Sequence, residues 1–334
     1  MAISLAWAVA CLILPAAFGG VEAHLETRDH ECAPYTYPPI QSRLSSFPPS
    51  WQTATLRADD WTARRIWQNI MPRVPAHVPI KNPDAPYLNE DPDCWWTFQQ
   101  CITPKLPGIP PDVASVPQPH TLGYGFDDGP NCSHNAFYDY LLAQKQKATM
   151  FFVGSNVIDW PLEAKRAYDD GHEICIHSWS HPYMTRLSNE QAFAELYYFS
   201  FIVQTWLVPH IHFQMAAVRL VTGITPNCWR PPFGDVDDRI RAIAHGLGLT
   251  TMLWKYDTND WKTGAGADPS EVDANYERFI AEAAGGAFST VGAILLMHEL
   301  NAFTMNQAMK YYPRFVDVFE EILPVGEAIR RGRN

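Results

Sequence analysis

The amino-acid sequence predicts an α/β fold built around a parallel β-sheet, and three observations support this prediction. Hydrophobic residues make up 47% of the 334 residues and charged residues 18%, which is typical of a chain that buries a large core. From residue 121 onward, short apolar runs alternate with segments of helical periodicity. Polar residues follow several of these runs. Strands that alternate with helices pair in parallel through right-handed crossovers, and six or seven such units could close into a barrel.

The expected elements follow one another in a regular order. We expect strands at 121–126, 148–153, 173–177, 227–231, 250–256 and 292–297. We expect helices near 135–147, 161–170, 189–207, 236–247, 270–284 and 305–323. The third of these helices begins with the sequence SNEQ at 188–191, which matches a capping box at a helix N-terminus.

Residues 1–23 have the pattern of a secretory signal peptide. An apolar run from Ala2 to Phe18 is followed by small residues and an expected cleavage site after Ala23. The run is short for a membrane span, no second long apolar stretch follows, and the final RRGRN is not the hydrophobic tail of a lipid-anchor signal. We therefore expect a secreted, extracellular or cell-wall-associated monomer with no stable membrane anchor. A formal net charge of −11 argues against a nucleic-acid partner.

Residues 24–120 form a proline-rich extension that we expect to pack on the barrel, and the barrel domain itself should span 121–330. The extension holds 17 of the 28 prolines and shows little sustained periodicity. One segment, 57–71, fits an amphipathic helix. Six cysteines remain after removal of the signal peptide, an even number that suits an oxidising compartment. Cys94 and Cys101 make a plausible local bridge, Cys175 is either bridged or a buried free thiol, and the other pairings stay open.

Residues able to do chemistry follow five of the expected strands. Strand 121–126 leads into Asp127 and Asp128, and 173–177 ends at the first histidine of the HSWSH segment, His177 and His181. The fourth strand, 227–231, carries Arg230, and Asp257 with Asp260 and then His298 follow the last two. In a β/α barrel such strand ends meet on one face. His172, His210, His212 and His245 do not lie at strand ends, so we expect ordinary structural positions for them.

The adjacent aspartates could simply be a solvated turn, but a divalent cation explains them better. One carboxylate would ligate the cation and the other would act as a base towards water, whose pKa such a cation lowers from ~16 towards ~7. Two imidazoles and a carboxylate form a ligand set typical of catalytic zinc. Arg230 could orient the base aspartate and keep it ionised, and Asp260 could hold His298 protonated.

The five segments together closely resemble the polysaccharide deacetylases of carbohydrate esterase family four, the NodB-homology domain, with the fungal chitin deacetylases as the most similar group. The motifs appear in order as GFDDGP (125–130), HSWSH (177–181), RPPFGD (230–235), DTNDW (257–261) and LLMH (295–298). The resemblance implies a distorted, seven- or eight-stranded, TIM-like (β/α) barrel. It also implies metal-dependent removal of acetyl groups from chitin or chitooligosaccharides, giving chitosan and acetate.

The resemblance also implies a role for each motif residue. As catalytic residues it implies the base Asp127, the acid His298, and their partners Arg230 and Asp260. As ligands of one divalent metal ion it implies Asp128, His177 and His181, with zinc expected and cobalt as the alternative. As substrate-binding residues it implies Trp261 and Leu296 at the acetyl methyl group and Pro232 and Phe233 near the oxyanion, where Phe233 contributes its backbone N–H.

Two residues depart from the family pattern, and three other functions stay open. Phe233 stands where tyrosine is common and Gly125 where threonine or serine is common, but neither change removes a ligand or proton carrier. An acetyl xylan esterase or peptidoglycan deacetylase would carry the same motifs. A carbohydrate-binding protein with a degenerate site is a non-enzymatic alternative, and His24 at a new N-terminus could bind copper. Asn131 lies in an N-x-S sequon next to Cys132, and a bridge at that cysteine would disfavour its use.

Overall fold

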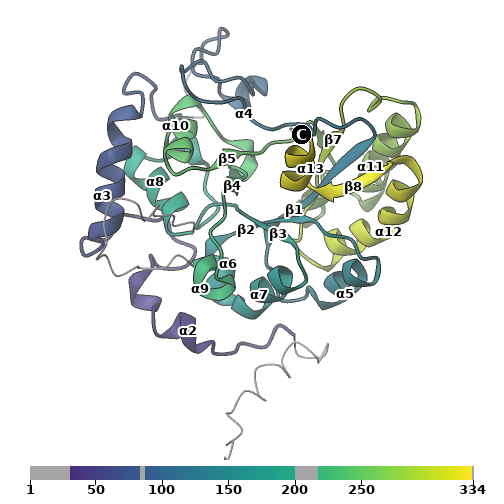
Figure 1. The fold of residues 1–334 in the computed structure, drawn as a ribbon, viewed down its shortest axis with the longest axis horizontal. Helices are drawn as coiled ribbons and strands as arrows, with labels where there is room; N and C mark the ends of the chain where they lie inside the picture. The colour runs from purple at the N-terminus through teal and green to yellow at the C-terminus, as the bar shows by residue number, and fades with distance from the viewer. Residues whose placement is uncertain (1–30, 83–86, 200–216, 333–334) are drawn as a thin grey trace, which may run out of the picture.

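The computed structural model describes residues 31–82, 87–199 and 217–332, which form an eight-stranded parallel sheet that curls into a distorted barrel with helices outside it (Figure 1). The strands are β1 (Thr121–Gly129), β2 (Thr149–Phe152), β3 (Glu173–Ile176), β4 (Cys228–Trp229), β5 (Thr250–Thr251), β6 (Tyr256–Asp257), β7 (Ala293–Leu296) and β8 (Glu321–Pro324). The predicted α/β barrel is therefore confirmed.

The strand order is β5-β4-β3-β2-β1-β7-β6, with β8 paired to β1. β1 pairs with β2 through 125–129 and with β8 through 121–124, so these two strands share one edge of β1 while β7 takes the other. The backbones of β1 and β2 approach closely, since a Cβ at Gly125 would lie 2.7 Å from the Thr149 carbonyl oxygen. This contact explains why glycine suits a position where the family pattern has a larger residue.

The predicted strand 250–256 is wrong as a single element. It consists of β5 and β6, which are the two ends of the sheet and pair with β4 and β7 respectively. Residues 252–255 connect them, and so short a linker spans at most about 18 Å. The two ends of the sheet must therefore lie near each other. Because no ladder joins β5 to β6 among the described residues, the barrel is open at this point.

The helices of the barrel are α5 (Asn135–Ala143), α6 (Gly154–Asp159), α7 (Pro161–Asp169), α8 (Asn189–Tyr197), α9 (Ala217–Thr222), α10 (Asp238–Gly246), α11 (Pro269–Ala284), α12 (Ala302–Val318) and α13 (Val325–Arg331). Short 3-10 turns are η4 (Met184–Arg186), η5 (Pro232–Gly234) and η6 (Asp260–Ala265). The predicted capping box at Ser188 and Gln191 is confirmed. The predicted helix 305–323 is wrong at its end, because the chain leaves α12 at 318 and its next apolar residues pair with β1 as β8.

The described part of the extension contains only short elements: α2 (Pro38–Gln41), η2 (Leu44–Ser46), α3 (Trp61–Ile70), η3 (Met71–Arg73) and α4 (Trp96–Gln99). The predicted helix within 57–71 is confirmed as α3. It lies alongside α8 (Figure 1), where the rings of Trp67 and Phe193 are 5.2 Å apart. The backbone N–H of Ala54 donates to the buried carboxylate of Glu195 at 2.7 Å. Trp67 and Ala54 therefore contact α8 through an apolar and a polar group, respectively.

Three disulfides connect the described chain: Cys32–Cys132, Cys94–Cys101 and Cys175–Cys228. The local pair at 94 and 101 is confirmed, and the alternative of a free thiol at Cys175 is wrong. β3 and β4 are neighbours in the sheet, which brings the Cα atoms of Cys175 and Cys228 to 5.0 Å, within bridging distance. Cys132 is bridged, which disfavours use of the Asn131 sequon.

The remaining sequence predictions concern the signal peptide, several histidines and the absence of a membrane span. The signal peptide, His24, His210, His212 and the end of the predicted helix 189–207 lie outside the described residues. His172 is buried and its Nδ1 accepts a hydrogen bond from the Ala148 N–H, as expected for a structural histidine. Within the described ranges, none of the helices has the length and apolar character that crossing a bilayer requires.

Candidate active site

The five motif segments surround one cavity of about 640 Å³ on the face where the strands end. Eight of the eleven predicted site residues line this cavity: Asp127, Asp128, His177, His181, Phe233, Trp261, Leu296 and His298. Arg230 and Asp260 lie behind the lining and contact it through Asp127 and His298. Pro232 is buried and does not line the cavity.

Asp128, His177 and His181 form a cluster suited to a metal ion. Each offers one ligand atom, and these atoms all lie within 4.8 Å of one another. Asp128 Oδ1 is 3.1 Å from His181 Nε2 and 3.4 Å from His177 Nε2, yet it is buried and has no hydrogen bond of good geometry. Such an arrangement fits three ligand atoms that converge on one point between them. It also matches the mixed nitrogen and oxygen donor set of a divalent transition metal.

A backbone contact sets the orientation of one imidazole. His177 Nδ1 lies 2.8 Å from the carbonyl oxygen of Arg230, and because a carbonyl only accepts, Nδ1 carries the proton in the neutral ring. Nε2 is then the nitrogen that faces Asp128 and is available as a ligand atom. The His181 backbone N–H donates to Ser178 Oγ at 3.0 Å, which fixes the turn that brings the second imidazole to the cluster.

The electrostatic environment keeps Asp128 ionised. Burial by itself raises the pKa of this carboxyl, but the adjacent imidazoles of His177 and His181 outweigh burial and hold the pKa well below its ordinary value. Asn156 in α6 supports the same residue from behind, since its side-chain amide donates to the Asp128 carbonyl oxygen at 2.7 Å.

Asp127 lies next to the cluster but has a different partner. Arg230 Nη1 donates to Asp127 Oδ1 at 2.7 Å, and both side chains are almost completely buried. The guanidinium lies 4.0 Å over the ring of Phe151, which fixes its plane. His177 Nε2 is 3.7 Å from the second carboxylate oxygen, Asp127 Oδ2. Asp127 lines the cavity beside the cluster, which suits an acceptor of protons.

His298 and Asp260 form a second buried pair at the cavity. Asp260 Oδ1 is 2.6 Å from His298 Nδ1, and Oδ2 accepts the His298 backbone N–H at 3.1 Å. Burial lowers the pKa of His298, but the charge and hydrogen bond of Asp260, with smaller contributions from Asp128 and Asp127, raise it to about 10. Because Nδ1 is occupied by Asp260, Nε2 is the nitrogen that can donate a proton towards the cavity.

Two aromatic side chains and one leucine form apolar parts of the cavity. Phe233 has a φ of 59°, and its ring stacks on Tyr183 with centroids 4.1 Å apart. Gly234 follows it, where a Cβ would lie 2.2 Å from the indole of Trp96, so only glycine fits beneath that ring. Trp261 is partly exposed in the turn η6, whereas Leu296 is buried at the end of β7.

Sequence reasoning missed several residues of the site. Asp235 is buried and its carboxylate accepts hydrogen bonds from Trp95 Nε1, Thr97 Oγ1 and the backbone N–H of Thr185, at 2.8–2.9 Å. Asp235 is the last residue of the RPPFGD segment, so its place in a motif could have indicated a role near the site. Asn156 follows the strand at 148–153, which was a weaker signal. Trp51 and Gln100 line the cavity from the extension, where no sequence pattern indicated a site.

Comparisons with known proteins agree with this geometry. Residues 115–252 match the family model for polysaccharide deacetylase, a range that holds the cluster residues, Asp127 and Arg230. A chitin deacetylase of Amylomyces rouxii is 40% identical over 88% of this chain and 69% of its own length. Chitin deacetylase 2 of Cryptococcus neoformans var. grubii is 47% identical over 88% of this chain, which spans 64% of that relative's length.

Solved structures of low sequence identity share the fold. The chitin deacetylase of Colletotrichum lindemuthianum aligns with a TM-score of 0.53 at 21% identity, covering 65% of this chain and 91% of that one. The peptidoglycan deacetylase PdaC of Bacillus subtilis aligns with a TM-score of 0.51 at 24% identity, covering 65% and 94%. With the site geometry and the sequence identity to the Amylomyces protein, these matches lead to one conclusion: the chain belongs to the polysaccharide deacetylase family.

Proposed function

We propose that this protein removes acetyl groups from N-acetylglucosamine units of chitin or chitin oligomers by metal-dependent hydrolysis. The observation that carries the proposal is the combination, in one cavity, of the Asp128–His177–His181 cluster with two separate proton carriers, Asp127 and His298. A hydrolase that cleaves an amide needs a base for water and an acid for the leaving nitrogen. The relatives named chitin deacetylase support the choice of substrate.

Asp128, His177 and His181 would hold one divalent metal ion. Their single carboxylate and two imidazoles suit zinc, with cobalt as the alternative. A bound divalent cation supplies Lewis acidity, which activates water and polarises a carbonyl group. The tautomer that Arg230 imposes on His177 prepares the cluster for such an ion.

The protein's own residues perform the proton transfers. Asp127 accepts a proton from the attacking water, and Arg230 orients the carboxylate through its hydrogen bond to Oδ1. His298 donates a proton from Nε2 to the leaving amine, because Asp260 keeps Nδ1 occupied and favours the protonated ring. The products are acetate and a free amino group on the sugar.

Apolar and backbone groups would position the acetamido group. Trp261 and Leu296 would contact its methyl group, and the backbone N–H of Phe233 would donate to the carbonyl oxygen as negative charge develops there. Pro232 would act indirectly, since it fixes the backbone of the turn η5 from a buried position.

We further infer that the protein acts outside the cell as a monomer after loss of residues 1–23. Three disulfides support an oxidising compartment. Residues 24–120 would then be an extension that packs on a catalytic domain at 121–330. Mass measurement of the secreted protein would reveal the cleavage site, and light scattering would reveal the oligomeric state.

A substrate panel tests the proposed function. Purified protein is incubated with N-acetylglucosamine oligomers, acetylated xylan and peptidoglycan, with and without a chelator, and acetate is measured. We expect acetate from the chitin oligomers only, abolished by the chelator and restored by zinc or cobalt. Asp127→Asn and His298→Ala should each lower turnover by about 10²–10⁴ while zinc stays bound. Acetate release that survives full metal removal would contradict the proposal, and release from xylan or peptidoglycan alone would redirect it to those substrates.

A further inference from the structure

Two segments of the N-terminal extension reach the cavity that holds the metal cluster. Trp51 and Gln100 lie outside the region that matches the family model, yet both line the cavity. Trp51 contacts α6, which follows β2, whereas the loop that carries Gln100 contacts the segments after β4 and β5. Since β2 lies two places away from β4 in the sheet, the extension approaches the cavity from two directions.

Trp51 is held rigidly although it is exposed. Its backbone N–H donates to Ser155 Oγ at 2.8 Å, and its indole Nε1 donates to Asp159 Oδ2 at 2.9 Å. The side chain is nevertheless 53% exposed, and its φ of 61° is in the left-handed region that bulky residues avoid. An exposed indole that is fixed in a costly conformation beside a cavity is a preorganised binding surface.

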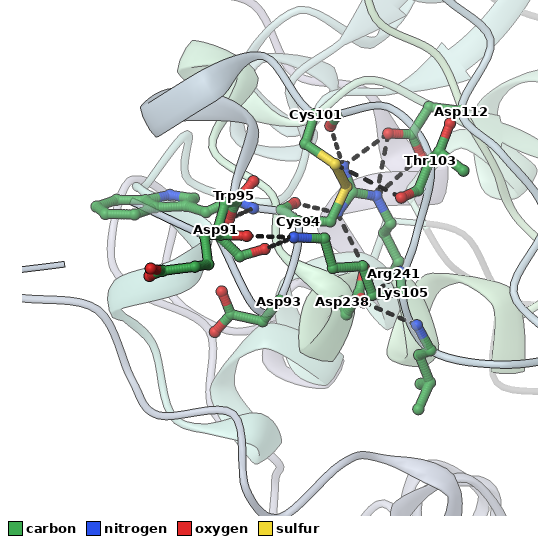
Figure 2. The surroundings of a disulfide bond; sticks show 12 residues. Asp91, Asp93, Cys94, Trp95, Cys101, Thr103, Lys105, Asp112, Asp238 and Arg241 are labelled. Atoms are coloured by element: carbon green, nitrogen blue, oxygen red, sulfur yellow. Dashed lines mark hydrogen bonds and ion pairs between the residues drawn. A yellow bond between two sulfur atoms is a disulfide. The ribbon is translucent and has the colours of Figure 1, made fainter. Parts of the chain in front are cut away.

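The second segment is a short loop closed by the disulfide Cys94–Cys101 (Figure 2). Buried Arg241 holds both ends of this loop, because Nη1 donates to the Cys94 carbonyl oxygen at 2.5 Å and Nη2 to that of Cys101 at 2.9 Å. The carboxylate of Asp112 in turn accepts hydrogen bonds from Nε and Nη2 of the same arginine at 2.7–3.0 Å. The loop therefore has little freedom to move away from the cavity.

The loop also contacts the turn that carries Phe233. The ring of Trp96 packs over Gly234, and its centroid lies 4.7 Å from that of Trp254. Asp235 joins the same turn to the loop through Trp95 and Thr97. Gln100, with a φ of 53°, ends the helix α4 and lines the cavity. Gln100 is thus placed on the cavity wall by a covalently closed support.

We propose that Trp51 and the Cys94–Cys101 loop bind sugar units next to the one whose acetyl group is removed. An indole face can cover the apolar C–H face of a pyranose ring, and an amide such as that of Gln100 can bond its hydroxyl groups. The inference rests on the proposed function for its substrate class. It assigns the extension a role in selecting longer chains, which the motif residues of the barrel do not explain.

The kinetic test compares Trp51→Ala with a matched control, Trp61→Ala. Trp61 is 79% exposed in the same extension but does not line the cavity. Acetate release is measured with the pentamer and the dimer of N-acetylglucosamine. For Trp51→Ala we expect kcat/KM on the pentamer to fall about tenfold, mainly through KM, with little change on the dimer. Gln100→Ala should show the same selectivity with a smaller fall. Trp61→Ala should match the unaltered protein.

Three outcomes would overturn the inference. The first is an equal fall in kcat/KM of Trp51→Ala on the pentamer and the dimer. The second is an unchanged KM of Trp51→Ala for the pentamer, and the third is the same fall in kcat/KM in the Trp61→Ala control. Binding separates this inference from the proposed function. Calorimetry with the pentamer compares Asp127→Asn with the double variant that adds Trp51→Ala. Weaker binding in the double variant supports the inference even if no acetate is ever released, and equal binding, or none to either variant, refutes it.

Discussion

Replacing Asp260 by asparagine isolates the charge of the buried carboxylate that faces His298. The two side chains approach to 2.6 Å, and burial limits the screening of their interaction. An opposite charge this close typically shifts a pKa by about 1–3 units, so Asp260→Asn should lower the pKa of His298 by that amount. The protonated fraction falls tenfold for each pH unit above the pKa. The alkaline limb of kcat should therefore move down by about 1–3 pH units.

The assay is acetate release from the N-acetylglucosamine pentamer across the pH range, with metal present. A cation bound at Asp128 would offset part of the negative charge that raises the pKa of His298. The alkaline limb of the kcat profile of the unaltered protein should therefore lie somewhat below pH 10. Asp273→Asn is the control, because it removes a carboxylate that bonds Lys310 on the surface. The electrostatic role of Asp260 would be refuted if the alkaline limb of the kcat profile stayed in place in Asp260→Asn. It would also be refuted if kcat fell by the same factor at every pH.

The same pair gives a prediction about stability that needs no substrate. The pKa of His298 is raised from 6.5 to about 10 in the folded state, so its stabilisation is complete below pH 6.5 and is lost as the pH rises towards 10. The difference in melting temperature between the metal-free unaltered protein and metal-free Asp260→Asn should be largest near pH 6 and should narrow by pH 10. A difference that stays constant would mean that the imidazole is not charged in the folded protein.

Three further changes probe the surroundings of the site. His181→Ala should weaken zinc binding by more than the roughly 10–100-fold seen when only a partner of a ligand is changed, as measured by competition with a chromogenic chelator. Asp235→Asn should lower the free energy of unfolding by about 1–3 kcal/mol in urea titrations. The carboxylate accepts hydrogen bonds from Trp95 Nε1 and the Thr185 N–H, and the new amide N–H₂ group would face one of these donors without being able to accept from it. Burial raises the pKa of Glu299 from 4.5 to about 8, so the folded state retains a proton that the unfolded state releases, and stability falls as the pH rises through this window. Glu299→Gln should remove that fall in melting temperature between pH 4.5 and 8.

The sequence predicted those parts of the fold that depend on local pattern. Strands of four or more apolar residues and amphipathic helices such as α3 and α11 were found because burial imposes their periodicity. β8 and the split between β5 and β6 were missed for a different reason. Both depend on which strand each short segment meets in the sheet, and a run of two to four residues holds no information about a partner far away in the chain.

The site shows the same division between local and long-range information. Its motif residues were recognisable because their side chains have the chemistry that hydrolysis requires and because each follows a strand. Trp51 was not recognisable as part of the cavity wall, nor were the contacts through which Asp235 joins the Cys94–Cys101 loop to the turn η5. Trp51 contacts Ser155 across 104 positions, and Asp235 accepts the Trp95 indole N–H across 140. Only the folded chain brings such pairs together, so composition and spacing could not reveal them.

Backbone strain explains why this long-range support is needed. Three motif residues that line the cavity, Asp128, His181 and Phe233, have φ values of 73°, 59° and 59°, in the region where an L-residue costs about 1–3 kcal/mol. Glycine would adopt these conformations without that cost, but it carries no carboxylate, imidazole or ring. Asn156 holds the carbonyl of Asp128, and Ser178 holds the N–H of His181, each through a side-chain hydrogen bond. The strained conformations persist because the surrounding residues fix them, and the proposed chemistry depends on the side chains of Asp128 and His181 and on the backbone N–H of Phe233.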